Sequence, residues 1–200
     1  AGKSTFLKVI SGQQDSTSGH VHLEPGKRMS ILEQNHNAYD SDTVLDTVLK
    51  GNKVLYKIKN EIDALYADYT DENAEKIGEL QVKFEEMDGW NADAEAAAML
   101  SNLGIAEDLH YSQMSDLDGK QKVRVLLAQA LFGNPDILIM DEPTNDLDFE
   151  TIGWLENFLA NYDNCVIVVS HDRHFLDAVC THISDIDFGK ITHYSGNYTF

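Results

Sequence analysis

The sequence contains little cysteine. Only two cysteines, Cys165 and Cys180, occur in 200 residues, and the eight histidines are scattered. Two cysteines cannot build the disulfide framework of a small secreted domain, and their separation is not that of a zinc site. We therefore expect Cys165, in an apolar strand, and Cys180, in a helix, to be ordinary buried residues of a protein from a reducing cytoplasm.

Basic residues and long apolar runs are also scarce. The 15 lysines and arginines stand against 34 acidic residues, so the net charge is −19. This charge repels phosphate backbones, which excludes nonspecific coating of nucleic acid and requires a local basic face for any nucleic-acid contact. No apolar stretch approaches the ~18 to 20 residues that cross a bilayer, and no leader-like segment opens the chain. The sequence therefore predicts no transmembrane segment.

The apolar residues that are present indicate one folded domain with an inserted lobe. They make up 42% of the chain, and the runs at 136–141 and 164–170 are long enough for a buried sheet. The pattern predicts strands at 20–24, 28–34, 136–141, 165–169, 183–187 and 190–194, and helices at 3–10, 120–132, 149–161 and 172–180. Strands that alternate with helices favour an α/β fold, in which a mostly parallel sheet is flanked by helices.

A helical segment interrupts this alternation. Between 43 and 103, apolar residues recur at three- and four-residue spacing, and the polar stretch TDEN (70–73) divides the pattern. We therefore predict an antiparallel helix pair near 50–88. The expected division is a core of 1–42 and 118–200 and an all-helical lobe of 43–117.

Charge is unevenly distributed in this lobe. Residues 50–59 contain four lysines (Lys50, Lys53, Lys57 and Lys59) and no acid, whereas 60–119 contain 16 acids and two bases. The lysines form either an ordinary solvated helical face or a stripe that meets an anionic partner.

The chain opens with a piece of a phosphate-binding motif. Gly2-Lys3-Ser4-Thr5 matches the end of G-x-x-x-x-G-K-[ST], in which backbone N–H groups hold phosphates, the lysine neutralises them and the hydroxyl of Ser4 binds Mg²⁺. Taken alone, the tetrapeptide also suits a helix N-terminus with an incidental lysine.

Polar groups follow three predicted strands. Asp141 and Glu142 end the 136–141 strand, His171 follows the 165–169 strand, and Gln34 ends the 28–34 strand. Because α/β sheets bind ligands at the carboxyl ends of their strands, we expect Asp141 to hold Mg²⁺ and Glu142 to orient or deprotonate a water. His171 would bond a γ-phosphate oxygen, and the Gln34 amide would reach the metal or the water. The acids could instead cap the following helix, a role that Pro143 and the further acids at Asp146 and Asp148 disfavour.

These pieces, in this order, resemble an ATP-binding cassette domain, and the strings DEPTNDLD, SHDRHFLDAV and YSGNY resemble the ABC-F subfamily of soluble cytoplasmic ATPases. The resemblance implies an ATPase that uses ATP and Mg²⁺. It matches Gly2, Lys3, Ser4 and Thr5 to the Walker A end, Gln34 to the Q-loop, Asp141 to the Walker B acid, Glu142 to the catalytic glutamate, Asn145 to Asp148 to the D-loop and His171 to the switch histidine.

The same resemblance places the family signature L-S-G-G-Q on Leu117-Asp118-Gly119-Lys120-Gln121. In the family, this segment and the D-loop complete the nucleotide site of a partner cassette. Asp118 puts a carboxylate where the γ-phosphate of that site would arrive, and Lys120 replaces a glycine. We expect Asp118 to act as a helix N-cap and the site completed by this segment to be weakened.

The resemblance also implies partners. YSGNYTF (194–200) is similar to the end of a first cassette, so we expect a second cassette in the same chain and action on the ribosome near a tRNA site. The helix pair resembles the arm of the subfamily, whose lysines could touch rRNA or ribosomal protein. The alternatives are the ATPase subunit of a membrane transporter and a nucleotide switch that does not hydrolyse ATP. A second cassette in the parent gene without a neighbouring permease would exclude the transporter.

The opening within the phosphate-binding motif gives a direct prediction. Because the glycines and the adenine-stacking aromatic residue that precede the GKST end in the family are not part of these 200 residues, we expect weak ATP binding by this chain alone. Calorimetric titration with ATP should detect no tight binding, and an affinity in the low micromolar range would contradict the expectation.

Overall fold

A computed structural model describes residues 2–199, which form two compact units. The first unit contains residues up to Gln34 together with those from Asn134 onward, and the second contains Asn35–Gly133. These limits differ from the expected core and lobe because helix α6 (Gly119–Leu131) packs on helices α2 (Val44–Leu49) and α5 (Ala92–Asn102) of the second unit. None of the helices within 2–199 combines the length and the apolar character needed to cross a bilayer.

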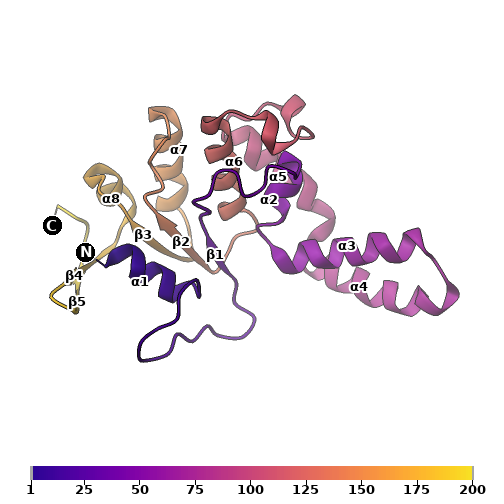
Figure 1. The fold of residues 1–200 in the computed structure, drawn as a ribbon, viewed down its shortest axis with the longest axis horizontal. Helices are drawn as coiled ribbons and strands as arrows, with labels where there is room; N and C mark the ends of the chain where they lie inside the picture. Colours follow the sequence, from indigo (N-terminus) through magenta and orange to yellow (C-terminus); the bar gives the residue numbers. More distant parts are fainter. Residues whose placement is uncertain (1, 200) are drawn as a thin grey trace. The chain divides into compact units, whose positions relative to one another are not determined.

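The first unit is built on a three-stranded parallel sheet, in the order β1 (Met29–Ile31), β2 (Ile137–Asp141) and β3 (Cys165–Val169) (Figure 1). The central strand β2 is the most buried of the three, with Leu138 and Met140 fully enclosed. Its apolar run was the clearest strand signal in the sequence, because a strand covered on both faces has a continuously apolar sequence.

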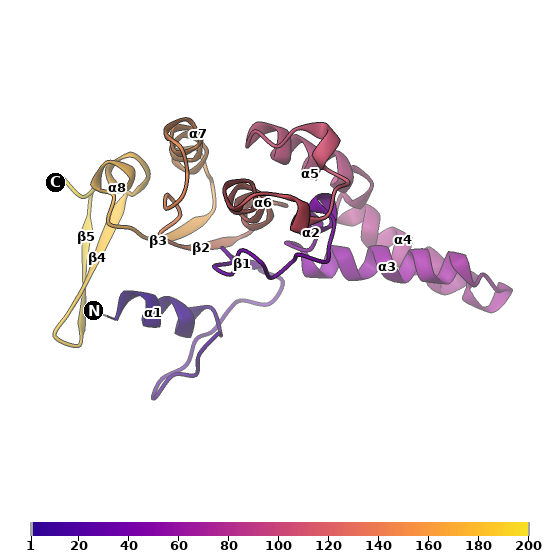
Figure 2. The ribbon, with the colours of Figure 1, turned by 45° about the horizontal axis from the view of Figure 1, so that its top comes forward.

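Helices cover both faces of this sheet. Figure 2 shows α1 (Lys3–Ile10) on one face, with α7 (Phe149–Ala160) and α8 (Arg173–Val179) on the other. The fold prediction is therefore confirmed: a parallel sheet is flanked by helices, and an all-helical segment is inserted between β1 and β2.

The last two strands form a separate antiparallel hairpin, β4 (His182–Asp187) and β5 (Lys190–Ser195), as predicted. The strand predicted at 20–24 is wrong, because these residues are irregular and exposed. A strand needs a neighbour to pair with its backbone groups, and no ladder with residues 20–24 exists in the described part of the chain.

The prediction of buried cysteines is also wrong. Cys165 is exposed and Cys180 is half-buried. Among residues 2–199, β3 pairs with β2 on one side only. Cys165, the first residue of β3, is therefore exposed, and the four residues after it are half-buried. Partial burial raises the pKa of the Cys180 thiol.

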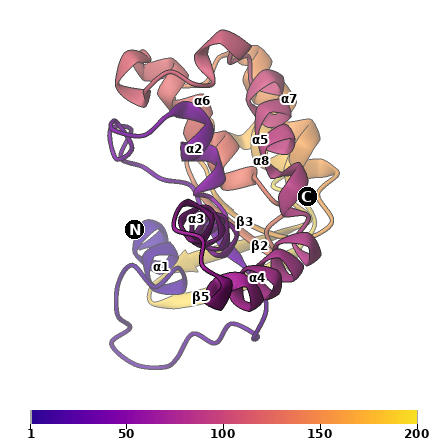
Figure 3. The same cartoon turned by 90° about the vertical axis from the view of Figure 1, so that its right-hand side faces the viewer.

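The second unit consists of helices and short 3₁₀ turns, η1 (Asp71–Asn73), η2 (Gly89–Asn91), η3 (Glu107–Leu109) and η4 (Met114–Asp116). Helices α3 (Lys53–Ala67) and α4 (Ala74–Glu86) run antiparallel and in contact; Figure 3 views α3 end-on with α4 beside it. Their facing sides bury Ile62, Ile77 and Leu80 at helical spacing. Phe84, near the end of α4, packs edge to face on Trp90 of η2, with the ring centroids 4.9 Å apart.

Lys122 fixes the loop that enters the second unit. Its side chain is 11% exposed, and its Nζ donates to Asn37 Oδ1 and Asp40 Oδ1, both at 2.8 Å. A buried ammonium needs such partners to offset the loss of hydration. The loop that follows Gln34 is therefore held against helix α6.

Candidate functional site

The predicted polar groups at the strand ends lie at one edge of the sheet. The register pairs Asp141 with Val169, so β2 and β3 end side by side, and β1 ends two residues earlier, with Ile31 opposite Ile139. Gln34 follows β1, and its Nε2 donates to the main-chain oxygen of Asp141 at 3.1 Å. The Gln34 side chain is thus in direct contact with the main chain of Asp141.

Glu142 links the ends of β2 and β3. Its N–H donates to the Val169 carbonyl at 2.7 Å, which continues the ladder by one residue. Its Oε2 accepts from the His171 N–H at 3.3 Å, and its Oε1 lies 3.3 Å from His171 Nε2. The Glu142 side chain is 21% exposed and that of His171 is 84% exposed, so the histidine faces solvent while the carboxylate is partly enclosed.

The backbone of Glu142 is in the left-handed region, with a φ of 47°. For a residue with a side chain this conformation costs ~1 to 2 kcal/mol, so it persists only where surrounding contacts impose it. The bonds to Val169 and His171 are such contacts. They hold the turn that follows Asp141 and fix the position of the Glu142 carboxylate.

Helix α1 presents an uncapped N-terminus. Gly2, at its N-cap, has a φ of 92°, a conformation that favours glycine, and no side chain caps the helix. The first-turn N–H groups of Lys3, Ser4 and Thr5 have no acceptor within an α-helix, and the helix dipole favours an anion there. All three residues are exposed, so this end can receive a phosphate.

A cleft of about 1130 Å³ extends from this helix to the end of β3. Lys3 and Phe6 of α1 line it together with Ser170, the residue before His171, and with side chains of α8 and the hairpin. Lys3 and the carboxyl end of β3 thus border the same cleft.

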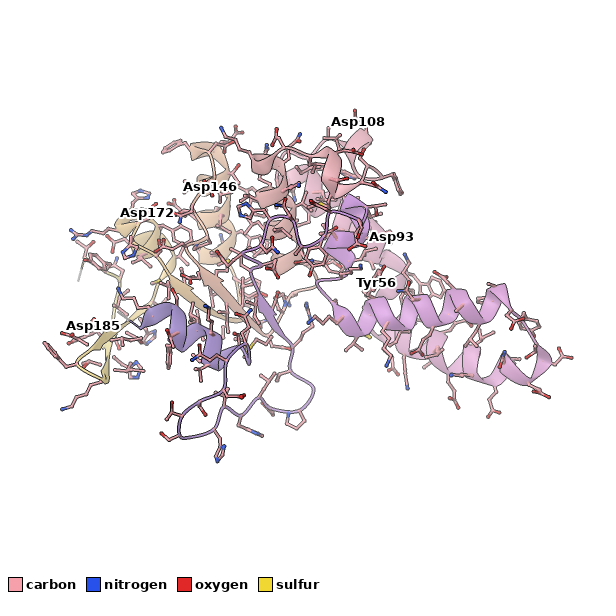
Figure 4. All side chains as sticks on the ribbon, in the orientation of Figure 1. Tyr56, Asp93, Asp108, Asp146, Asp172 and Asp185 are labelled. Carbon is pink, nitrogen blue, oxygen red and sulfur yellow. The ribbon has the colours of Figure 1, made fainter. Side chains whose placement is uncertain are left out.

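The turn after β2 holds the predicted D-loop residues Asn145 and Asp148. Both Asn145 and Asp146 are exposed, and Asp146, which is labelled in Figure 4, lies in the turn between β2 and α7. Its φ is 63°. Asp148 is the N-cap of α7, where its Oδ1 accepts from the Thr151 N–H at 2.7 Å. The cap of the helix that follows is therefore Asp148, and not Asp141 or Glu142, for which the sequence disfavoured that role.

The predicted signature residues lie in the second unit, at the start of α6. Asp118 Oδ1 accepts from the Gln121 N–H at 2.8 Å, and Gln121 Oε1 accepts from the Asp118 N–H at 3.0 Å. This reciprocal capping box confirms the N-cap expected at Asp118. Gly119 and Lys120 are exposed beside it. Sequence reasoning missed the buried Lys122 one residue further on, because a lysine in an amphipathic helix gives no local sign of burial.

The donors at the strand ends suit Mg²⁺ rather than a structural metal. No group of three or more histidine, cysteine or acidic side chains with metal-site spacing occurs within the described residues. The oxygens available at the strand ends are the carboxylates of Asp141 and Glu142 and the Gln34 amide, and the Ser4 hydroxyl of helix α1 remains a candidate from the sequence. Mg²⁺ is commonly held by one or two carboxylates together with substrate phosphates and water, so these residues fit a magnesium ion that arrives with a triphosphate.

Comparisons with known proteins identify the family of the chain. Residues 1–145 match the family described as ABC transporter. The chain is 56% identical, over its whole length, to the uncharacterized ABC transporter ATP-binding protein YkpA of Bacillus subtilis, of which it covers 37%. It is 37% identical, again over its whole length, to the energy-dependent translational throttle protein EttA of Mycobacterium tuberculosis, of which it covers 36%.

Among solved structures, the fold matches the dimeric, post-hydrolysis ATP-binding cassette MJ0796 bound to ADP and Pi, with a TM-score of 0.64 and 20% identity. The match covers 97% of this chain and 80% of that one, and at this identity it establishes the fold. The chain spans little more than a third of the length of the curated relatives.

The capping box gives a testable prediction for stability. Asp118→Ala leaves the Gln121 N–H without its acceptor and should lower the free energy of unfolding by about 0.5 to 2 kcal/mol in urea denaturation. Asp118→Ser should retain most of the stability. The control is Asp116→Ala, which removes the same charge from an exposed residue nearby. Equal losses for Asp118→Ala and Asp116→Ala would show that the cap contributes nothing.

Proposed function

Since the chain belongs to the ATP-binding cassette family, we propose that it is the first cassette of a tandem-cassette ATPase of the ABC-F branch, which acts on the ribosome in the cytoplasm. The observation that carries the ATPase assignment is the contact of Glu142 with His171 at the strand ends, beside Asp141 and Gln34. This arrangement joins a partly enclosed carboxylate, an exposed imidazole and an amide at one edge of the sheet.

The chain would bind the phosphates of ATP through the start of α1. The first-turn N–H groups and the Lys3 ammonium are donors that suit phosphate oxygens. Ser4, Gln34 and Asp141 would hold the Mg²⁺, which neutralises charge on the phosphates when it is bound. Thr5, in the first turn of α1, and Gly2, the N-cap residue with a left-handed backbone, would complete this phosphate-binding turn.

Glu142 is the group best placed to act on a water. Its carboxylate is partly enclosed, with an N–H donor on Oε2 and the imidazole near Oε1, so its orientation is fixed. A fixed carboxylate can accept a proton from an attacking water. His171, being exposed, would bond the γ-phosphate, and Gln34 would report its presence to the loop that Lys122 holds.

A second cassette would complete the site. We place Gly119, Lys120 and Gln121 of the signature, with Asn145 and the D-loop, against the nucleotide of that partner. The Asp118 carboxylate already accepts the Gln121 N–H, so this helix start offers less to an incoming phosphate than one capped by a neutral residue. The site completed by this segment would therefore be the weaker of two.

Replacing Glu142 tests the catalytic assignment. In the full-length protein, Glu142→Gln removes the proton acceptor and keeps the shape of the side chain. We expect ATP hydrolysis at this site to slow by roughly 10²- to 10⁴-fold while ATP remains bound. Turnover is measured with the second cassette carrying the matching substitution. The control is Glu156→Gln, a change on α7 at a carboxylate that contacts His174 of α8. Unchanged turnover would assign Glu142 another role.

The ribosomal target is tested separately. The name of EttA refers to translation and that of YkpA to transport, so the choice between the two functions requires an experiment. We expect the full-length protein with Glu142→Gln, and its counterpart in the second cassette, to co-sediment with ribosomes in the presence of ATP. A protein that stays out of the ribosomal fraction, and is recovered instead with a membrane partner, would favour a transporter ATPase.

A further inference from the structure

A short tail, residues 196–199, follows the β4–β5 hairpin and returns to helix α8 within the first unit (Figure 2). The Gly196 N–H donates to the Thr181 carbonyl at 2.7 Å, which extends the pairing of the hairpin by one residue. The hairpin thus brings the tail back to α8, the helix that begins two residues after His171.

Two side chains of α8 hold the tail. The Asp177 carboxylate accepts two hydrogen bonds from Thr199, one on Oδ1 from the N–H at 2.8 Å and one on Oδ2 from the hydroxyl. The guanidinium of Arg173 lies 5.2 Å from the centre of the Tyr198 ring, close enough for a cation–π contact. Arg173 and Asp177 are four residues apart, so they lie on the same side of the helix. These four residues make up the α8–tail contact.

The start of α8 is bound to the residues around His171. The Asp172 N–H donates to Ser170 Oγ at 3.0 Å, and Asp172 Oδ1 accepts from the Phe175 N–H at 3.1 Å as the N-cap of α8 (Figure 4). His171 lies between Ser170 and Asp172, and its own N–H donates to Glu142. A displacement of His171 would therefore move the beginning of the helix.

Helix α8 can carry such a displacement to the tail. It has seven residues, packs on α7 and is fixed to the core by Phe175, which is fully buried. Packed helices move as bodies that slide past each other by small distances. Arg173, Tyr198 and Thr199 are exposed, and contacts between exposed groups are individually weak. The α8–tail contact therefore depends on α8 being held in one position.

We propose that Arg173 and Asp177 are positioning residues that couple the occupancy of the nucleotide site to the order of the chain that leaves this cassette. A γ-phosphate held by His171 would fix the start of α8 and thereby stabilise the α8–tail contact, and loss of that phosphate would loosen both. The inference rests on the proposed function, which supplies the nucleotide and a second cassette further along the chain. It adds a regulation of the same site, because the link to that cassette would be ordered while ATP is bound.

The test measures hydrogen–deuterium exchange by mass spectrometry in the full-length protein that carries Glu142→Gln and its counterpart in the second cassette, so that ATP stays bound. We expect ATP to slow exchange in α8 and in the tail together. With ATP present, Asp177→Ala should make the tail exchange at least about fivefold faster, because the Thr199 N–H loses its acceptor. The variant should also abolish the effect of ATP on the tail while the effect on α8 remains.

Further variants separate the contact from general damage to α8. Thr199→Val removes a hydroxyl outside the helix and should reduce the ATP effect on the tail, and adding Asp177→Asn should change it by less than the sum of the two single effects. Tyr198→Leu should reduce it as well. The matched controls are Tyr194→Leu, which removes a ring of similar exposure from β5, and Asp163→Ala, which removes an exposed carboxylate between α7 and β3. Neither control should alter the response of the tail.

Two results would overturn the proposal. The first is a tail that exchanges equally fast with and without ATP although α8 responds to the nucleotide. The second is an ATP effect on the tail that survives both Asp177→Asn and Tyr198→Leu, because the α8–tail contact would then order the end of the chain without transmitting anything.

Failure of this inference and failure of the proposed function have different signatures. If the protein binds and hydrolyses ATP but the tail does not respond, the coupling is wrong and the ATPase assignment stands. If no ATP binds, the proposed function fails and the coupling fails with it. If the tail responds to ATP but the protein does not co-sediment with ribosomes, the coupling stands and the ribosomal target is wrong.

Discussion

The candidate site depends on the parallel register of β2 between β1 and β3. Because Ile139 pairs with both Ile31 and Ile167, β2 and β3 end together and β1 ends two residues before them, so the residues that follow the three strands lie at one edge of the sheet. A shift of one residue would turn Leu138 and Met140 to the opposite faces of the sheet and would separate Asp141 from Val169. The burial of these apolar side chains therefore also positions the carboxylates.

The pairing of β2 with β3 also fixes the position of the Glu142 carboxylate. The left-handed backbone is unfavourable for glutamate, and its bonds to Val169 and His171 hold it there. The sheet thus maintains a conformation that a free chain would rarely adopt. Because the carboxylate is fixed by the same contacts, its orientation toward the imidazole needs little further ordering when a substrate arrives.

The sequence predicted features whose cause is local. The continuous apolar runs indicated β2 and β3, and the polar residues directly after them indicated the strand-end groups. It failed where the cause is distant. Lys122 is buried because Asn37 and Asp40, far away in the sequence, accept its hydrogen bonds, and Cys165 is exposed because of its place in the sheet. The alternation at 20–24 suggested a strand, but pattern alone does not supply a pairing partner.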